Sequence, residues 1–180
     1  KMSEEWLALA LVRLGEHLDR EVLADGAYYE VTQGYNAWVH AGYTLLQHLM
    51  AQNGRSMPAE DVAKLKKMVR WVAMQQTPNL TVPATGDATL NGSVLDAVAF
   101  TAPIFDLPEV KYVIRSTPIT SDKFWEIGPE MFRKYAAMAP VAPEESSMYF
   151  DASGFIFMRE DWSDDANFLF FNCAVDGGGR

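Results

Sequence analysis

The chain has 180 residues, with 49% hydrophobic residues, 22% charged residues and a formal net charge of −9. These values are typical of a globular protein, and the length is enough for one domain or for parts of two. The acidic balance argues against nucleic acid as a partner, because nucleic acid requires stripes of Lys and Arg, and it counts mildly against a polyanionic substrate. No apolar run reaches the ~18 residues that a membrane span needs.

The first 138 residues predict a series of helices, because apolar residues recur at the spacing of a helix face. Asp25-Gly26 ends the first helix, and Pro58 fits the first turn of the third. A loop is expected over residues 77–91, and Gly128-Pro129 predicts a bend in the last helix. The expected helices cover approximately residues 3–23, 35–52, 58–72, 93–101 and 120–138.

The pattern changes after a linker at residues 139–147, which is rich in Pro, Glu and Ser. Short runs rich in aromatic and β-branched residues follow at 148–150, 154–159 and 167–175, and they predict strands. We therefore divide the chain into a helical part, residues 1–145, and the start of a β domain, residues 146–180. Because two or three strands do not form a stable sheet domain alone, we expect a fragment, or the ordered part, of a longer chain.

The single cysteine, Cys173, excludes an internal disulfide and a CxxC metal site. Its position in an apolar run predicts a buried, unreactive thiol. No signal pattern of basic and then apolar residues opens the chain. The sequence also contains no HExxH, GxSxG, GxGxxG or Walker-type motif.

Three stretches resemble segments of one enzyme family. Residues 25–36 contain an Asp-Gly turn, an aromatic pair followed by Glu, and a Tyr that opens a helix. Residues 82–87 look like a Pro-x-x-Gly-Asp loop between helices. Residues 153–162 and 167–171 are similar to two strands with a Gly-aromatic start, an Arg and a Trp. Together and in this order, they resemble the heparinase II/III-like polysaccharide lyases, which include oligo-alginate lyase-like members.

The resemblance implies a multidomain fold of helices and then strands. The chain would be the C-terminal part of an (α/α) toroid followed by the first strands of an antiparallel β-sandwich. Enzymes of this family cleave uronate-containing polysaccharides by β-elimination in a cleft between the two domains. A tyrosine protonates the leaving glycosidic oxygen, and Tyr35 matches that tyrosine. A periplasmic or secreted location is also implied.

The same resemblance implies that other parts of the site lie outside this chain. No cofactor is visible in the sequence. A zinc or calcium site in the sandwich domain would take its ligands from beyond Arg180. The expected partner is an acidic polysaccharide or oligosaccharide, with no nucleic acid and no membrane span, and oligomerisation is left open. Asn36 stands where many relatives have His, and the acidic net charge fits poorly with a heavily sulfated substrate. A less charged uronate polymer such as alginate therefore fits at least as well as heparin.

Physical chemistry supports Tyr35 as the candidate catalytic residue. A Tyr in the first turn of a helix, after Gly34, can project into a cleft at the helix end. A phenol, whose ordinary pKa is near 10, can donate a proton to a leaving alkoxide. Without the resemblance, the same pattern also fits an aromatic that anchors the helix start.

Six further residues are candidates for substrate binding. Gln33, Asn36 and His40 are expected near Tyr35, and Trp38 is either a core aromatic or a platform on which a sugar stacks. Glu30 either binds sugar hydroxyls or ties its loop to the helix.

Arg159, in an otherwise apolar strand, requires an anionic partner. That partner is either a carboxylate of the helical part or the substrate's carboxylate. His17 is interpreted as a surface residue and His48 as a solvated or core histidine.

Two other functions also fit the sequence. A glycoside hydrolase on a toroid would need two carboxylates across a cleft, and only Glu30 and Asp87 are available here. A non-catalytic carbohydrate-binding module would keep the aromatic surface but would not need the hydroxyl group of Tyr35.

Overall fold

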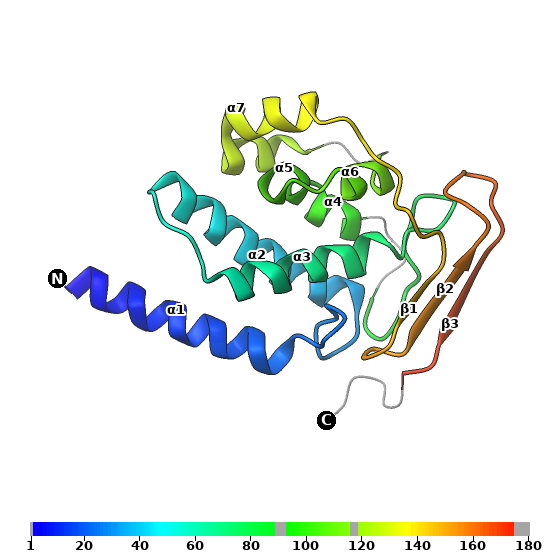
Figure 1. Ribbon diagram of the computed structural model, residues 1–180, viewed down its shortest axis with the longest axis horizontal. Coiled ribbons are helices and arrows are strands. Elements are labelled where there is room, and N and C mark those ends of the chain that lie inside the picture. Colours follow the sequence, from blue (N-terminus) through cyan, green and yellow to red (C-terminus); the bar gives the residue numbers. More distant parts are fainter. Residues whose placement is uncertain (1, 89–92, 116–118, 175–180) are drawn as a thin grey trace.

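The computed structural model describes residues 2–88, 93–115 and 119–174. The helices lie together at one end and a small sheet lies at the other (Figure 1). The elements in chain order are α1 (Met2–Glu21), α2 (Gln33–Gln52), α3 (Ala59–Ala73), α4 (Ser93–Ala99), α5 (Thr101–Phe105), α6 (Pro108–Val113), α7 (Ser121–Ala137), β1 (Met148–Phe150), β2 (Phe155–Arg159) and β3 (Phe168–Asn172). None of the helices in these ranges is long and apolar enough to cross a membrane.

The predicted helices are confirmed, with shifts at their ends. Thr32 caps α2, because its hydroxyl oxygen accepts a hydrogen bond from the backbone N–H of Tyr35, and the helix therefore starts two residues earlier than expected. Pro58 is the N-cap of α3 rather than a residue of its first turn. The expected helix at 93–101 ends at Ala99, and α5 follows it.

The bend predicted in the last helix is confirmed in α7. Gly128 has φ 78° and ψ 167°, outside the helical region, and Pro129 follows it. Since proline lacks a backbone N–H and glycine tolerates positive φ, this pair divides α7 into two helical halves.

The sheet has the order β1-β2-β3, and both pairs are antiparallel. Phe150 pairs with Phe155, and Phe157 pairs with Phe170. Alternate residues of β2 face the helices, so Phe155 and Phe157 are fully buried. Cys173 is exposed. The prediction of a buried thiol is therefore wrong, because Cys173 lies just beyond β3, whose residues are mostly exposed.

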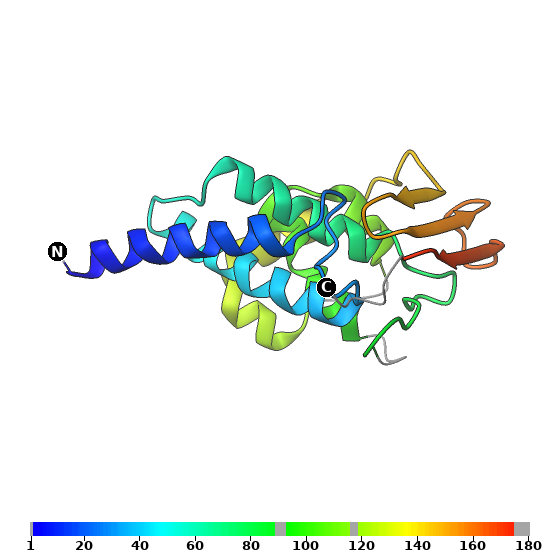
Figure 2. The ribbon, with the colours of Figure 1, turned by 90° about the horizontal axis from the view of Figure 1, so that it is seen from below.

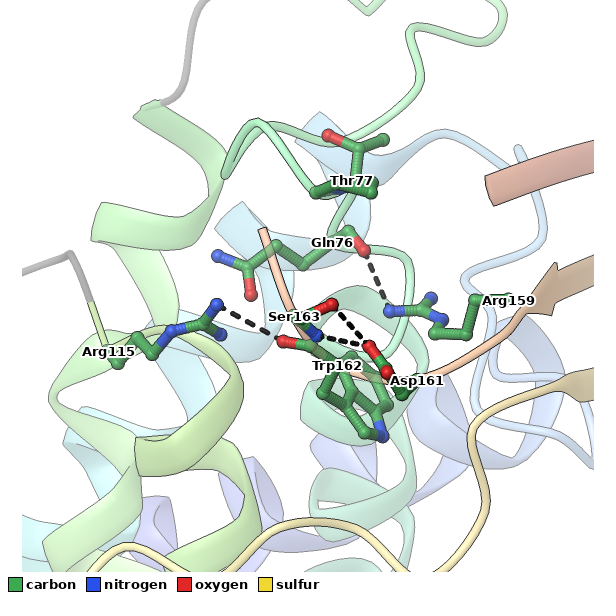
Figure 3. Close-up of a pocket in the computed structure, with 8 residues that line it drawn as sticks. Gln76, Thr77, Arg115, Arg159, Asp161, Trp162 and Ser163 are labelled. Atoms are coloured by element: carbon green, nitrogen blue, oxygen red, sulfur yellow. Dashed lines mark hydrogen bonds between the residues drawn. The ribbon is translucent and has the colours of Figure 1, made fainter. Parts of the chain in front are cut away.

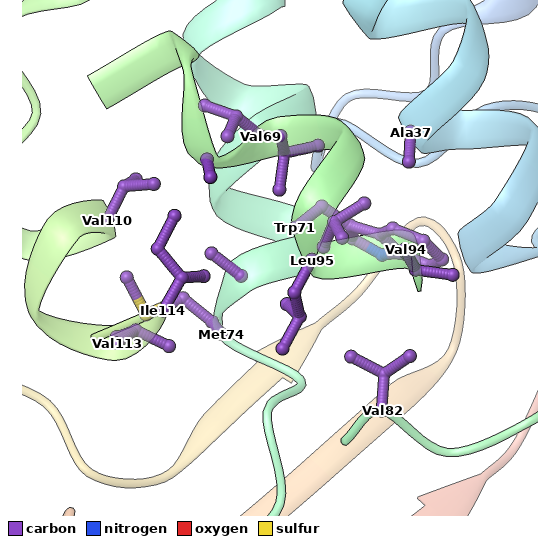
Figure 4. Packing of buried hydrophobic residues seen from close by; sticks show 14 of the residues in the cluster. Ala37, Val69, Trp71, Met74, Val82, Val94, Leu95, Val110, Val113 and Ile114 are labelled. Carbon is purple, nitrogen blue, oxygen red and sulfur yellow. The ribbon is translucent and has the colours of Figure 1, made fainter. Parts of the chain in front are cut away.

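One hydrophobic core joins the helices to the sheet. Trp71 of α3 stacks on Phe155 with 5.5 Å between ring centroids, and it meets Phe150 edge-on at 6.3 Å. On its other side the core is filled by aliphatic residues of α3, α4 and α6 (Figure 4). Seen from below, the sheet lies against the end of the helical layer (Figure 2). Because α3 and the strands bury apolar surface against each other, the sheet gains the support that three strands need. The division near residue 145 stays a prediction.

Candidate active site at the start of helix α2

The three stretches that carried the resemblance meet at the carbonyl end of α3. The Asp25 carboxylate accepts hydrogen bonds from the backbone N–H and the hydroxyl of Ser153, at 2.7 and 2.8 Å. The Ser153 hydroxyl oxygen in turn accepts from the indole N–H of Trp71, at 3.0 Å. Ser153 is only 2% exposed. A series of buried hydrogen bonds therefore links the loop before α2 to the turn before β2. Asp25 and Ser153, which it joins, are 128 residues apart in sequence.

A second buried network holds the first turn of α2. The Gln33 side-chain amide donates to Gln75 Oε1 at 2.8 Å, and Gln33 Oε1 accepts from the Thr85 hydroxyl at 2.8 Å. Gln75 also donates to the backbone carbonyl of Trp71. The Pro-x-x-Gly-Asp loop is thus fixed against α2 and α3 together. Such fully satisfied networks stabilise one geometry, because breaking them would leave buried polar groups without partners.

Tyr35 stands on this fixed turn with its side chain 40% exposed. Two residues before it, Gln33 is fully buried, and one residue after it, Asn36 donates to the carbonyl of Gly26 at 2.8 Å. The backbone on both sides of Tyr35 is therefore held, while its ring projects outward. The role of Tyr35 as the catalytic residue stays a prediction.

The other predicted binding residues divide into an exposed and a buried group. Trp38 is 75% exposed, so the core interpretation of this residue is wrong. Glu30 is partly exposed, and its carboxylate, through a hydrogen bond, raises the pKa of the neighbouring Tyr29 hydroxyl. Gln33, Asn36 and His40 have no exposed surface. In this structure the last three support the helix rather than line its surface.

Arg159 has partners of an unexpected kind. Its guanidinium donates to the backbone carbonyls of Met74 at 2.6 Å and Gln76 at 2.9 Å, and it stacks on Trp162 at 3.9 Å from the ring centroid. The prediction of a carboxylate partner within the chain is wrong for the described residues, where no carboxylate lies within salt-bridge distance of Arg159. The carbonyl end of a helix carries partial negative charge, which attracts a cation.

His40 is buried beside Thr44, whose hydroxyl lies 3.2 Å from the His40 Nε2 atom. Burial lowers the pKa of His40 to about 3, so the ring is neutral at pH 7. In the unfolded chain the ring takes up its proton near pH 6.5. The unfolded state therefore binds more protons between pH 6.5 and 3, and acidification over this range favours unfolding.

We expect the His40→Gln variant to lack this acid sensitivity. Relative to the variant, the wild-type protein should lose ~1.4 kcal/mol of unfolding free energy for each pH unit below 6.5. Urea denaturation of both proteins at pH 7, 6 and 5 measures this difference, because the contributions of all other groups cancel. A constant difference across the three pH values would show that His40 is accessible to protons in the folded state.

The remaining histidines lie in ordinary structural contacts. His17 is not a simple surface residue, as its Nδ1 atom lies 2.8 Å from the Tyr43 hydroxyl and its ring stacks on that of Tyr43. His48 is 5% exposed and contacts Gln52. Within the described part of the chain, no group of three or more His, Cys, Asp or Glu residues could hold a metal ion.

Sequence reasoning missed the residues that assemble the site. Gln75, Thr85 and Ser153 carry no chemical motif, and only their burial in the folded chain gives them a role. Thr85 and Ser153 lay inside the stretches with family resemblance, which was the one available signal. Gln75 lay in none of them.

Comparisons with known proteins agree on the fold. Three of the similar solved structures are the heparinase III described as the BT4657 gene product (TM-score 0.78, 20% identity), the heparan sulfate lyase HepC from Pedobacter heparinus (0.74, 18%) and a structure described as heparinase III (0.70, 17%). The matches cover 98%, 97% and 99% of this chain, but only 25%, 25% and 27% of those chains. The chain thus spans about a quarter of the length of these proteins. A comparison with curated protein sequences finds no match.

At these identities the likeness establishes a shared fold, in which a mostly helical region is followed by an antiparallel sheet. The family described as "Heparinase II/III N-terminus" matches residues 1–110, which is more than half of the chain. The chain therefore belongs to the heparinase II/III family.

Proposed function

We propose that the protein containing this chain is a polysaccharide lyase that cleaves a uronate-containing polysaccharide or oligosaccharide by β-elimination. The observation that carries this proposal is the placement of Tyr35, which is exposed on a turn that the buried Gln33 network and the hydrogen bond from Asn36 to Gly26 hold in place. Pre-organised placement of a proton donor is what general acid catalysis requires. Membership of the heparinase II/III family supports the same reaction class.

In the proposed reaction a base removes the proton on C5 of the uronate, and a double bond forms between C4 and C5. The bond from C4 to the glycosidic oxygen breaks, and the Tyr35 phenol gives its proton to that oxygen. The phenolate regains a proton from water or from the base before the next cycle. Trp38 offers an exposed ring face to a sugar, and Glu30 offers an acceptor to sugar hydroxyls.

The proposal gives Gln33, Asn36 and His40 a positioning role, because their polar groups are enclosed by protein. It also includes an (α/α) toroid formed with further helices, a β-sandwich that begins near residue 146, and a periplasmic or secreted location, all by analogy with the family. The net charge of −9 favours a substrate of moderate charge, such as alginate, over a heavily sulfated one.

Ultraviolet absorbance of the protein that contains this chain, incubated with a panel of uronate polysaccharides, tests the reaction class. β-Elimination leaves a double bond conjugated to the uronate carboxylate, which absorbs ultraviolet light, whereas hydrolysis leaves none. We expect absorbance to rise with at least one substrate. New reducing ends without absorbance would identify a hydrolase, and sugar binding without either signal would identify a binding module; both results would contradict the lyase proposal.

A further inference from the structure

Polar contacts join the sheet to the helical part at separate places. Beyond the end of α3, Arg159 of β2 donates to the backbone carbonyl of Gln76 (Figure 3). In the turn between β1 and β2, the backbone N–H and the hydroxyl of Ser153 donate to the carboxylate of Asp25, which lies between α1 and α2. Of these two contacts, the second involves a residue of the loop that leads into α2 and to Tyr35.

A short series of hydrogen bonds runs from Asp25 to the turn that carries Tyr35. The second carboxylate oxygen of Asp25 accepts from the backbone N–H of Ala27 at 3.1 Å. Gly26 lies between these two residues, and its carbonyl accepts the side-chain amide of Asn36 at 2.8 Å. Asn36 directly follows Tyr35 and has no exposed surface. The Asp25 carboxylate therefore fixes the carbonyl that holds the residue next to Tyr35.

The segment before α2 requires support from outside, because part of its backbone is strained. Val31 has φ 51°, in the left-handed region. This conformation is unfavourable for a β-branched residue, and it persists only where surrounding contacts hold it. One such contact is the hydrogen bond from the Thr85 hydroxyl to the Val31 carbonyl, at 3.2 Å. The hydrogen bonds of Asp25 and Asn36 hold the segment on either side of Val31 in sequence.

We propose, on the basis of the proposed lyase function, that Asp25 is a positioning residue for Tyr35. It acts through the Gly26 carbonyl and Asn36, and its own position is fixed by Ser153 from the sheet. A carboxylate suits this role, because hydrogen bonds to an ionised acceptor are stronger than those between neutral groups. The turn between β1 and β2 thus takes part in placing the proton donor, although it lies outside the helical part.

The Asp25→Asn variant of the protein that contains this chain tests this role. The variant keeps the size of the side chain, but its NH₂ group cannot accept the hydrogen bonds that one carboxylate oxygen accepts. We expect kcat for β-elimination to fall at least about tenfold, with KM changed less than about twofold, because a hydrogen bond to a charged group is lost away from the substrate. Asp151→Asn is the matched control and should keep the wild-type kcat. Asp151 lies in the same turn as Ser153, is exposed, and accepts from Tyr149.

A double variant separates positioning from a general effect on the fold. If Asp25 acts through the Tyr35 hydroxyl, Asp25→Asn should lower the residual rate of Tyr35→Phe by less than about twofold, since the group that Asp25 positions is already absent. An equal fold-reduction in both backgrounds would overturn the proposal, because a purely structural effect does not depend on that hydroxyl. All rates are measured at a temperature where each variant is fully folded.

Hydrogen exchange, followed by mass spectrometry of peptides from α2, gives a readout that needs no substrate. The backbone N–H groups of Tyr35 and Asn36 donate to the Thr32 hydroxyl and carbonyl. We expect exchange in this first turn to be at least about tenfold faster in Asp25→Asn, with the last turn of α2 unchanged. Unchanged exchange in the first turn would overturn the proposal even in an active lyase. A wild-type protein without β-elimination activity would instead overturn the proposed function, and faster exchange in Asp25→Asn would still support the control of the Tyr35 turn by Asp25.

Discussion

Replacing Tyr35 with phenylalanine is expected to lower the rate of β-elimination by about 10²- to 10⁴-fold, the usual contribution of a positioned general acid. The phenylalanine ring keeps the aromatic volume and removes only the hydroxyl group. Because the turn is held by Gln33, Asn36 and Thr32 rather than by the Tyr35 side chain, the variant should fold normally. Initial rates of absorbance increase with the best substrate measure the effect.

The matched control is Tyr149→Phe, a tyrosine in β1 that is 63% exposed and that hydrogen-bonds only to the nearby Asp151 among the described residues. This variant should keep the wild-type rate. Substrate affinity should change little in Tyr35→Phe, since the hydroxyl acts mainly in the transition state. An unchanged rate in the Tyr35→Phe variant would exclude Tyr35 as the acid, whatever the reaction class of the protein.

The Gly26→Ala substitution is expected to destabilise the fold by about 2–4 kcal/mol, the sum of a positive-φ penalty and steric overlap. Gly26 has φ 97°, and a Cβ atom there would lie 2.4 Å from the carbonyl carbon and oxygen of Lys67 and 2.8 Å from the backbone N of Met68. These atoms belong to α3, so the helix itself would have to move. Chemical denaturation measures the loss.

Gly54→Ala separates the two contributions. Gly54 also has positive φ, 67°, but a Cβ atom there would meet nothing within 4 Å. Its substitution should cost only ~1 kcal/mol. Equal losses of unfolding free energy in the two variants would show that steric overlap between a Cβ atom at position 26 and α3 adds nothing to the cost of substitution. Because Gly26 also accepts the Asn36 hydrogen bond, its displacement should impair the Tyr35 site as well.

The sequence predicted most of the secondary structure, because local signals determine it. Helical spacing, the Gly128-Pro129 pair and the alternating aromatic runs all act within a few residues. The family resemblance was also confirmed, because it rested on short stretches of sequence that can be recognised without knowledge of the fold. It also identified residues 25–36 as the place to look for a site.

Burial was harder to predict, because it depends on contacts between distant segments. Trp38 and His40 lie on one helix two residues apart, yet one is 75% exposed and the other is fully buried. Local spacing does not show which face of α2 packs on α3 and α4. The partners of Arg159 were missed because the expected acceptor was a side chain, whereas the acceptors are backbone carbonyls that every residue type carries.

Because Arg159 binds backbone carbonyls, the contact between α3 and β2 tolerates side-chain substitution at the residues that supply them. Arg159 donates to the backbone carbonyl of Met74, so this hydrogen bond depends on the path of the backbone and not on the side chain at position 74. Substitutions at that position can therefore change the packing of the core while the joint between helix and sheet stays intact. A change in the path of the backbone just after α3 would instead disturb both hydrogen bonds of Arg159 and so its contact with β2.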